Sequence, residues 1–120
     1  MAIHQVSRRA MGQQIEAAAE QFLRGHGLEF EARNYYTRRG EIDLIFHHNN
    51  VLVFIEVRYR KRNSYGSGAE TVTVSKQQKL RLAAEHYLQQ QYAEPLPDCR
   101  FDVLSGCGDP VTFDWIQNAF

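Results

Sequence analysis

Residues 41–60 read EIDLIFHHNNVLVFIEVRYR and contain two strand-like stretches joined by a short turn. In the first stretch, EIDLIFH, polar and apolar residues alternate, which predicts that Ile42, Leu44 and Phe46 share one face of a strand. The second stretch, 51–60, begins apolar and ends polar, and the HHNN segment between them is typical of a hairpin turn. We therefore expect an antiparallel pair of strands at the centre of the fold.

The segments on either side of this hairpin predict an α/β domain with a mixed sheet. Ser75 and Gln78 have the spacing of a capping box and mark the start of the second helix. The elements expected around the hairpin are a helix and a strand before it, and a helix and two strands after it: 7–24, 28–36, 75–91, 100–104 and 111–115. The predicted order is α-β-β-β-α-β-β within a single domain, 1–120, whose first eight residues or so are expected to form a flexible arm.

The charge of the chain is balanced in total but not along its length. The 120 residues include 14 basic and 14 acidic side chains, yet residues 1–90 carry 13 of the basic and nine of the acidic ones. A basic face for nucleic acid is therefore compatible with the neutral total. No apolar run approaches the ~20 residues of a membrane span, and no secretory signal is visible. Cys99 and Cys107 lack the spacing of a metal knuckle, which favours free thiols and a cytoplasmic location.

Two carboxylates interrupt the apolar hairpin, Asp43 within 42–46 and Glu56 within 51–57. Burying a carboxylate is unfavourable unless something neutralises it, and two on adjacent strands repel each other. A divalent cation is the simplest compensation, and oxygen ligands without histidine or cysteine favour Mg²⁺ or Mn²⁺. Strand periodicity places Glu56 beside Arg58, so that an acid holding the metal and a cation could serve one phosphate. The alternative is a same-face ion pair on a half-exposed strand.

Basic residues flank these acids on both sides. One group precedes the first strand of the hairpin, and another follows the second strand into a Gly/Ser loop whose tyrosine could either stack on a base or pack against the protein. Two lysines in the first turns of the second helix oppose the helix dipole, which a bound phosphate would offset. The residues expected to contact nucleic acid are Arg38, Arg39, Arg60, Lys61, Arg62, Tyr65, Lys76 and Lys79. The alternative for each group is a solvated surface.

These motifs occur in an order that resembles the YraN family of small bacterial proteins. They are GEIDLI at 40–45, FIEVRYR at 54–60, a Tyr-Gly loop, an S-K-x-x-K-L helix start and a final R-F-D-V strand. Through that family the chain resembles the PD-(D/E)XK nuclease superfamily, which includes restriction-endonuclease-like enzymes and Holliday-junction resolvases. The resemblance covers most of the chain and implies a restriction-endonuclease-like fold, with a mixed central sheet flanked by helices.

The resemblance also implies a set of site residues. Asp43 and Glu56 match the metal-binding acids, and Glu16 matches a helical glutamate that completes such sites as a further ligand. Arg58 stands where the superfamily usually has the catalytic lysine. Glu41 shares the predicted strand face of Asp43. It would either bind the metal directly or contact the residues that bind it.

The activity implied is that of a metal-dependent endonuclease acting on phosphodiester bonds of DNA, including branched or recombination and repair intermediates. An arginine cannot serve as a general base, because its pKa lies above about 12. Water would then be activated by the metal, or Lys76 or Lys79 would supply the missing lysine. The alternative is a catalytically weak or inactive nuclease-fold protein that binds nucleic acid or assists DNA processing. Resolvases of this kind work as dimers, so the resemblance raises a homodimer as one assembly, with DNA as the partner and no membrane.

Overall fold

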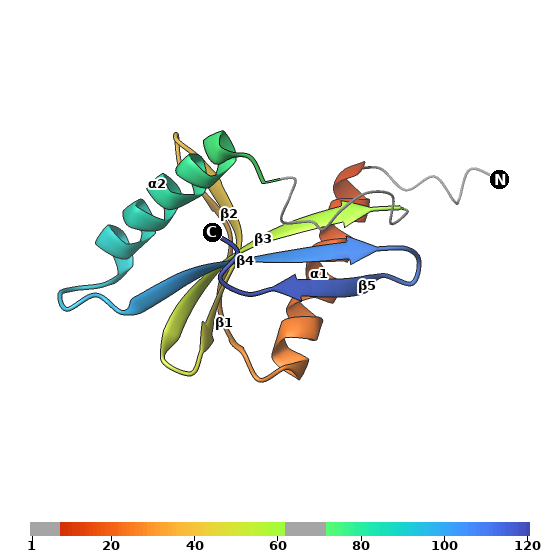
Figure 1. The fold of residues 1–120 in the computed structure, drawn as a ribbon, viewed down its shortest axis with the longest axis horizontal. Coiled ribbons are helices and arrows are strands. Elements are labelled where there is room, and N and C mark those ends of the chain that lie inside the picture. Colours follow the sequence, from red (N-terminus) through yellow and green to blue (C-terminus); the bar gives the residue numbers. More distant parts are fainter. Residues whose placement is uncertain (1–7, 62–71) are drawn as a thin grey trace.

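The computed structural model describes residues 8–61 and 72–120 of the chain. Within them the helices and strands follow the predicted order, α-β-β-β-α-β-β (Figure 1). Their bounds are α1 Arg8–Gly25, β1 Glu29–Tyr36, β2 Glu41–His48, β3 Val51–Arg60, α2 Val74–Gln91, β4 Asp98–Cys107 and β5 Thr112–Ile116. The predicted arm, 1–8, lies outside the described residues except for Arg8, which begins α1.

The five strands form one mixed sheet in the order β1-β2-β3-β4-β5. Strands β1 and β2, β2 and β3, and β4 and β5 pair antiparallel. Strands β3 and β4 run parallel and pair along their whole length, from Val51 with Asp98 to Arg60 with Cys107. A parallel pair needs a crossover connection, and α2 lies in that connection.

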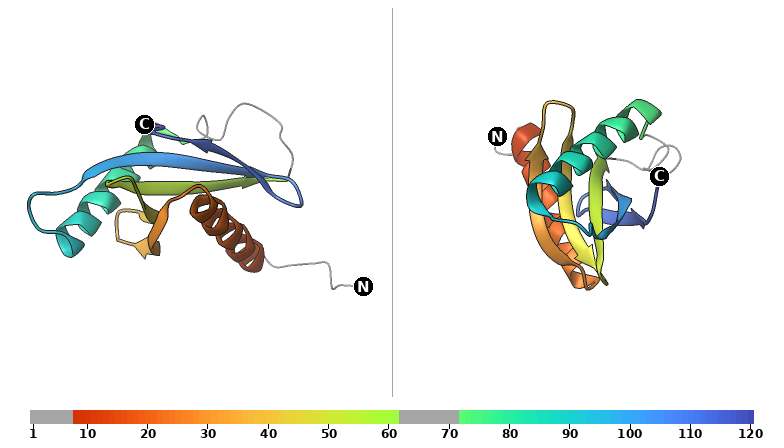
Figure 2. Two further views of the ribbon diagram at one scale, coloured as in Figure 1. Left: turned by 90° about the horizontal axis from the view of Figure 1, so that it is seen from below. Right: turned by 90° about the vertical axis from the view of Figure 1, so that its left-hand side faces the viewer.

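Each face of the sheet packs against one helix. Leu52 and Phe54 of β3 pack with α2, whereas Val53 and Ile55 pack with α1, as the predicted alternation requires. Figures 1 and 2 show α2 crossing one half of the twisted sheet and α1 crossing the other half. Neither described helix combines the length and apolar character needed to cross a membrane.

The alternation predicted for β2 is wrong at Ile42. Ile42 packs with Ile45 in the core under α2, whereas Leu44 and Phe46 pack in the core under α1. Two residues three apart can share a side only if the strand is irregular between them. Leu44, Ile45 and Phe46 alternate as expected, so the departure lies between Ile42 and Leu44, where β2 stops pairing with β3.

One buried acid, Asp102 of β4, holds the C-terminal part of the chain. Its carboxylate is fully buried and accepts hydrogen bonds from Arg100 Nε at 2.9 Å and Trp115 Nε1 at 2.9 Å. The backbone amide of Asn118 donates a further bond at 2.9 Å. Asp102 is therefore a structural acid, and Cys99 and Cys107 are free thiols, as the sequence predicts.

Candidate functional site

The candidate site lies where the sheet divides between β2 and β3. Their pairing ends at Leu44 and Ile55, so Asp43 and Glu56, which would be the next pair, are outside the ladder. Strand β2 continues with β1 as far as Glu41, and β3 continues with β4 to its end. In place of a ladder bond, the backbone amide of Val57 donates to Asp43 Oδ2 at 2.8 Å. The fork between the strands thus brings the two predicted acids together.

The environment of Asp43 disfavours its charged form. Burial, and then the negative charge of Glu56, raise the pKa of Asp43 to about 8 from 3.8. A hydrogen bond to Glu56 and the charge of Glu16 act in the same direction, and the bond from Val57 opposes them. The pair therefore holds a proton at neutral pH in the absence of a cation.

Glu56 is almost fully buried and is compensated by two cations. Lys76 Nζ lies 3.0 Å from Glu56 Oε2, and Arg58 Nη1 lies 3.4 Å from the same oxygen. Arg58 projects from the same face of β3 as Glu56, as predicted, and Lys76 reaches the acid from α2. Of the two lysines considered for the missing catalytic lysine, the structure thus brings Lys76 to the acid pair.

The start of α2 determines which lysine reaches the acids. Thr73, and not the predicted Ser75, is the N-cap residue: its hydroxyl oxygen accepts from the amide of Lys76 at 3.1 Å. Lys79 lies one turn later, where its carbonyl oxygen packs against Gly40, and a Cβ at Gly40 would lie only 2.6 Å from that oxygen. This contact holds the β1–β2 turn against α2.

Glu16 lies near the pair, on the α1 side. Burial raises the pKa of Glu16, the charges of Glu20 and Glu41 add to this, and a hydrogen bond with Asn34 opposes it. Glu41 itself is exposed on β2. Asn34, which sequence reasoning missed, adopts a left-handed backbone conformation with φ of 53°. That conformation is common for asparagine in turns and irregular strands, but no sequence pattern links it to a glutamate in α1.

A pocket of about 280 Å³ opens beside the acids, between α1 and the end of β3. Glu16 and Asp43 are among its lining residues. The rest of the lining is mostly apolar: Met11, Gly12, Ile15, Val57 and Tyr59. One side of the acid pair is therefore accessible to a bound molecule.

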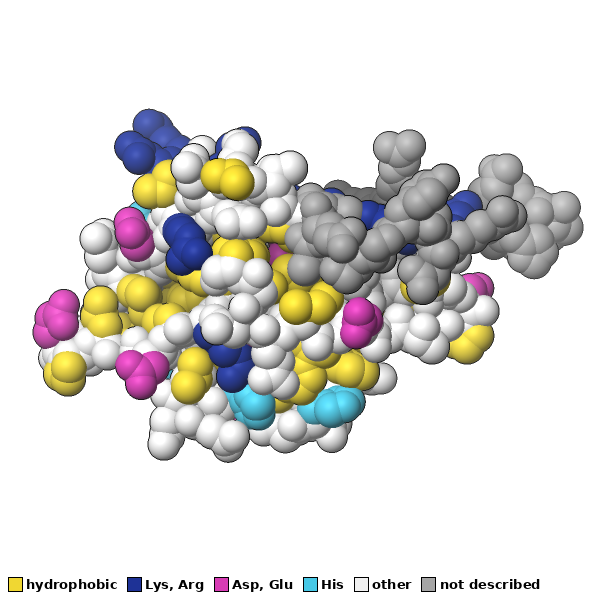
Figure 3. All heavy atoms as spheres, in the orientation of Figure 1, with side chains coloured by type: hydrophobic (Ala, Val, Ile, Leu, Met, Phe, Trp, Pro, Cys, Tyr) yellow, Lys and Arg dark blue, Asp and Glu magenta, His cyan; other side chains and the backbone are white. Residues whose placement is uncertain are grey.

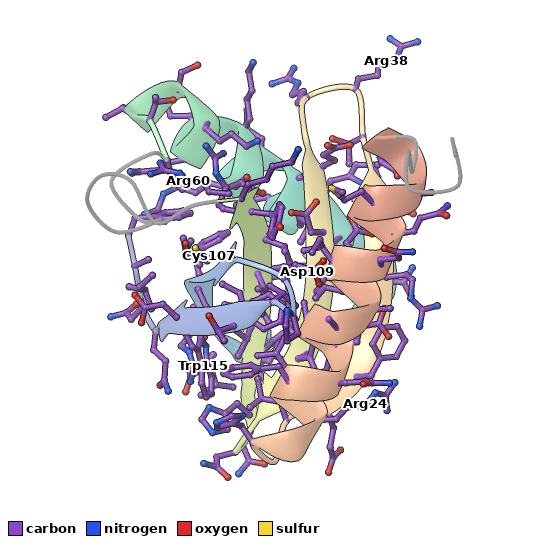
Figure 4. The ribbon with its side chains drawn as sticks, turned by 90° about the vertical axis from the view of Figure 1, so that its right-hand side faces the viewer. Arg24, Arg38, Arg60, Cys107, Asp109 and Trp115 are labelled. Carbon is purple, nitrogen blue, oxygen red and sulfur yellow. The ribbon has the colours of Figure 1, made fainter. Side chains whose placement is uncertain are left out.

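Basic residues lie at the same end of the sheet as the acids. Figure 4 shows Arg38 at the tip of the β1–β2 turn, pointing away from the sheet, and Arg60 near the end of β3. Arg39 and Lys61 are exposed. In Figure 3, Lys and Arg side chains lie over the β1–β2 turn and the start of α2, and acidic ones lie over the connection from α2 to β4, with further side chains of both signs elsewhere on this face. The predicted residues Arg62 and Tyr65 lie outside the described residues.

Asp43 and Glu56 are the residues that could hold a cation. Their donors are oxygens only, and a bound cation would offset both the burial and the repulsion by Glu56 that raise the pKa of Asp43. Within the described residues, no three His, Cys, Asp or Glu side chains are arranged to hold a metal ion by themselves. Mg²⁺ does not require such a group, because one or two carboxylates with water and substrate phosphates commonly complete its coordination. The pair fits a hard divalent ion of this kind.

Comparisons with known proteins match most of the chain. The model of a family described as "Uncharacterised protein family UPF0102" matches residues 15–105. A UPF0102 protein of Aeromonas hydrophila is 50% identical over 110 residues, which are 91% of this chain and 83% of that protein. UPF0102 proteins of Vibrio parahaemolyticus and Saccharophagus degradans are 45% and 47% identical, covering 94% and 91% of this chain and 93% and 91% of their own lengths. The matched segment contains Glu16, Asp43, Glu56 and Lys76.

Proposed function

The chain belongs to the UPF0102 family, and we propose that it is a metal-dependent nuclease of the PD-(D/E)XK superfamily that hydrolyses phosphodiester bonds of DNA. The observation that carries the proposal is the fork in the sheet. There Asp43 lies beside Glu56, whose carboxylate contacts the ammonium group of Lys76, and Asp43 lines an open pocket. Two acids and a lysine are the residue types that the resemblance to this superfamily implies.

Asp43 and Glu56 would hold Mg²⁺ or Mn²⁺. Bound there, the cation would polarise the phosphodiester and favour ionisation of a water molecule. Glu16 lines the same pocket from α1 and would be the third acid of the set.

Lys76 and Arg58 would stabilise the negative charge that develops on the phosphate. Both already contact Glu56 Oε2, at 3.0 and 3.4 Å, so they lie at the acid that would face the phosphate. The ammonium group of Lys76 can donate up to three hydrogen bonds, and the planar fork of Arg58 suits phosphate oxygens. Lys76 thus takes, from α2, the role that the superfamily gives to a lysine on the strand, where this chain has Arg58.

DNA cleavage assays test the proposal directly. Single-stranded, duplex and four-way branched DNA of related sequence are incubated with the purified protein in Mg²⁺, in Mn²⁺ or in EDTA. We expect cleavage that requires the cation, is lost in Asp43→Ala and persists in Glu29→Ala, which removes an exposed acid of β1. If the wild-type protein and Asp43→Ala are equally inert on all substrates, the nuclease proposal is wrong.

A second candidate is a nuclease-fold protein that binds DNA without cleaving it. The observation that favours it is that Lys76 and Arg58 already compensate Glu56 without a metal. Calorimetric titration with Mg²⁺ and Mn²⁺ separates the candidates. A nuclease should bind the cation through Asp43 and Glu56, whereas a protein that only binds DNA does not need the cation. The DNA affinity of such a binding protein should be the same in EDTA as in Mg²⁺.

A further inference from the structure

The pocket beside the acids adjoins a second hollow along α1. The first part, of about 280 Å³, begins at Asp43. A second hollow of about 270 Å³ shares Met11, Ile15 and Tyr59 with it and extends to the β4–β5 turn. Each part is at the small end of ligand pockets, which run from roughly 300 to 1,000 Å³. Each could therefore take one flat group and not a large ligand.

Gly12 has no side chain, and this leaves the volume of the pocket free for a ligand. It lies inside α1, where glycine is about 1 kcal/mol less favourable than alanine. Apart from its chain neighbours and the backbone of α1 itself, a Cβ at this position would have no atom of the described residues within 4 Å. Packing among the described residues therefore does not require a glycine here. Gly12 lines the pocket, and a side chain at this position would occupy it.

Tyr59 gives the pocket a fixed aromatic wall. Its hydroxyl donates to the carbonyl oxygen of Gly108 at 3.1 Å, so the far end of the ring is held by the β4–β5 turn. Met11, Ile15 and Val57 add apolar surface. Apolar and aromatic walls suit the face of a nucleobase, and such stacking tolerates any base.

We propose that this pocket receives the nucleobase of the nucleotide next to the cleaved phosphodiester, turned out of its stack, so that the substrate is unpaired DNA. The proposal rests on the proposed function, because a phosphodiester at Asp43 and Glu56 places its neighbouring nucleoside at the pocket that Asp43 lines. A base inside an intact duplex would have to leave its pair to enter the pocket, and this requires a few kcal/mol. Single strands, flaps and the unpaired parts of branched DNA lack that penalty.

Binding of short oligonucleotides tests the pocket without relying on cleavage. Fluorescence anisotropy compares a single-stranded DNA 12-mer with the same 12-mer carrying abasic sugars, and with a perfect duplex, using Ca²⁺ in place of Mg²⁺ to slow cleavage. Base stacking of 1–3 kcal/mol corresponds to a loss of about five- to 150-fold in affinity when the bases are removed. We expect a loss in this range for the wild-type protein, and weaker binding of the duplex than of the single strand.

Gly12→Leu fills the pocket and should remove the preference for base-bearing DNA, so that both 12-mers bind alike. Gln13→Leu adds the same side chain at the next, exposed position of α1 and should keep the preference. Circular dichroism verifies that both variants fold. If Gly12→Leu does not fold, Gly12→Ala replaces it, because one methyl group improves helix propensity and should still reduce the preference.

The outcomes separate this inference from the nuclease proposal. If the wild-type protein binds both 12-mers alike, or Gly12→Leu keeps the wild-type preference, the base pocket is wrong even when cleavage depends on Asp43. If the preference depends on Gly12 but no DNA is cleaved, the pocket is supported and the nuclease proposal is wrong. Equal affinity for the duplex and the single strand would exclude unpaired DNA as the preferred substrate.

Discussion

Replacing Asp43 with asparagine should stabilise the metal-free protein while abolishing cleavage. Asp43 accepts a hydrogen bond from the Val57 amide at 2.8 Å and faces Glu56. The carbonyl oxygen of an asparagine can keep the first contact, and its amide group can donate to the Glu56 carboxylate. The variant therefore imitates a permanently protonated Asp43, without the cost of taking up a proton.

The sign and size of the effect follow from the raised pKa of Asp43. Burial and the charge of Glu56 raise this pKa from 3.8 to about 8. Between these values the folded protein holds a proton that the unfolded chain has released, so wild-type stability falls as pH rises. One such proton corresponds to about 1.4 kcal/mol per pH unit. The difference in unfolding free energy between Asp43→Asn and the wild type should therefore increase by about this amount per pH unit between roughly pH 5 and 7, and should level off near pH 8.

Urea unfolding followed by circular dichroism, in EDTA at several pH values, measures the effect. The quantity compared is the difference in unfolding free energy between Asp43→Asn and the wild type. Glu29→Gln, which changes an exposed acid, is the matched control. A difference that stays flat between pH 5 and 7 would refute the argument from burial and charge repulsion. Adding Mg²⁺ should stabilise the wild type more than the variant and so reduce the difference.

Three further substitutions test other parts of the structure. Lys76→Met should lower kcat about 100-fold, because the variant loses an ammonium group that faces the negative charge developing on the phosphate. Lys79→Met should leave kcat unchanged, and cleavage rates of the two variants on one DNA substrate test this. Asp102→Ala should lower the free energy of unfolding by about 3–5 kcal/mol, because it leaves the Arg100 guanidinium without its buried partner; urea unfolding measures this. Gly40→Ala should destabilise the protein by about 1–3 kcal/mol in thermal unfolding, because its Cβ would lie 2.6 Å from the Lys79 carbonyl oxygen.

Each of these predictions has a matched control. Equal cleavage rates for the two methionine variants would exclude Lys76 from the reaction. Asp114→Ala removes an exposed acid of β5 and should leave stability near that of the wild type. At Gly25 a Cβ would meet no described atom within 4 Å apart from its chain neighbours and the backbone of α1, so Gly25→Ala should not destabilise the protein. A similar loss of stability at Gly25 and Gly40 would contradict the steric argument.

Much of the fold could be predicted because its elements have clear local signals. Strand β3 occupies 51–60, as predicted, since its alternation matches a sheet with a helix on each face. The order of the helices and strands followed from the helical and strand periodicities along the chain. The N-cap of α2 was less predictable, because Thr73 and Ser75 both suit that position, and the hydrogen bond from the Lys76 amide selects Thr73.

The site was only partly predictable, because its geometry depends on contacts between distant segments. Asp43 and Glu56 stood out as acids in apolar strands, but alternation alone placed Ile42 on the wrong side. The fork lies where β2 stays paired with β1 while β3 stays paired with β4, and these pairings join segments that local alternation does not relate. Choosing between Lys76 and Lys79 likewise required the position of α2 over β3, and Asn34 gave no sequence signal at all.

The fork also has a spectroscopic consequence. The Val57 amide has lost its ladder partner on β2 and is hydrogen-bonded to the carboxyl of Asp43 instead. Its proton and nitrogen chemical shifts should therefore follow the ionisation of that single carboxyl, with a midpoint near pH 8. A cation at the acid pair should move the same resonance at constant pH. In an NMR spectrum, one backbone signal would thus report the charge state of Asp43.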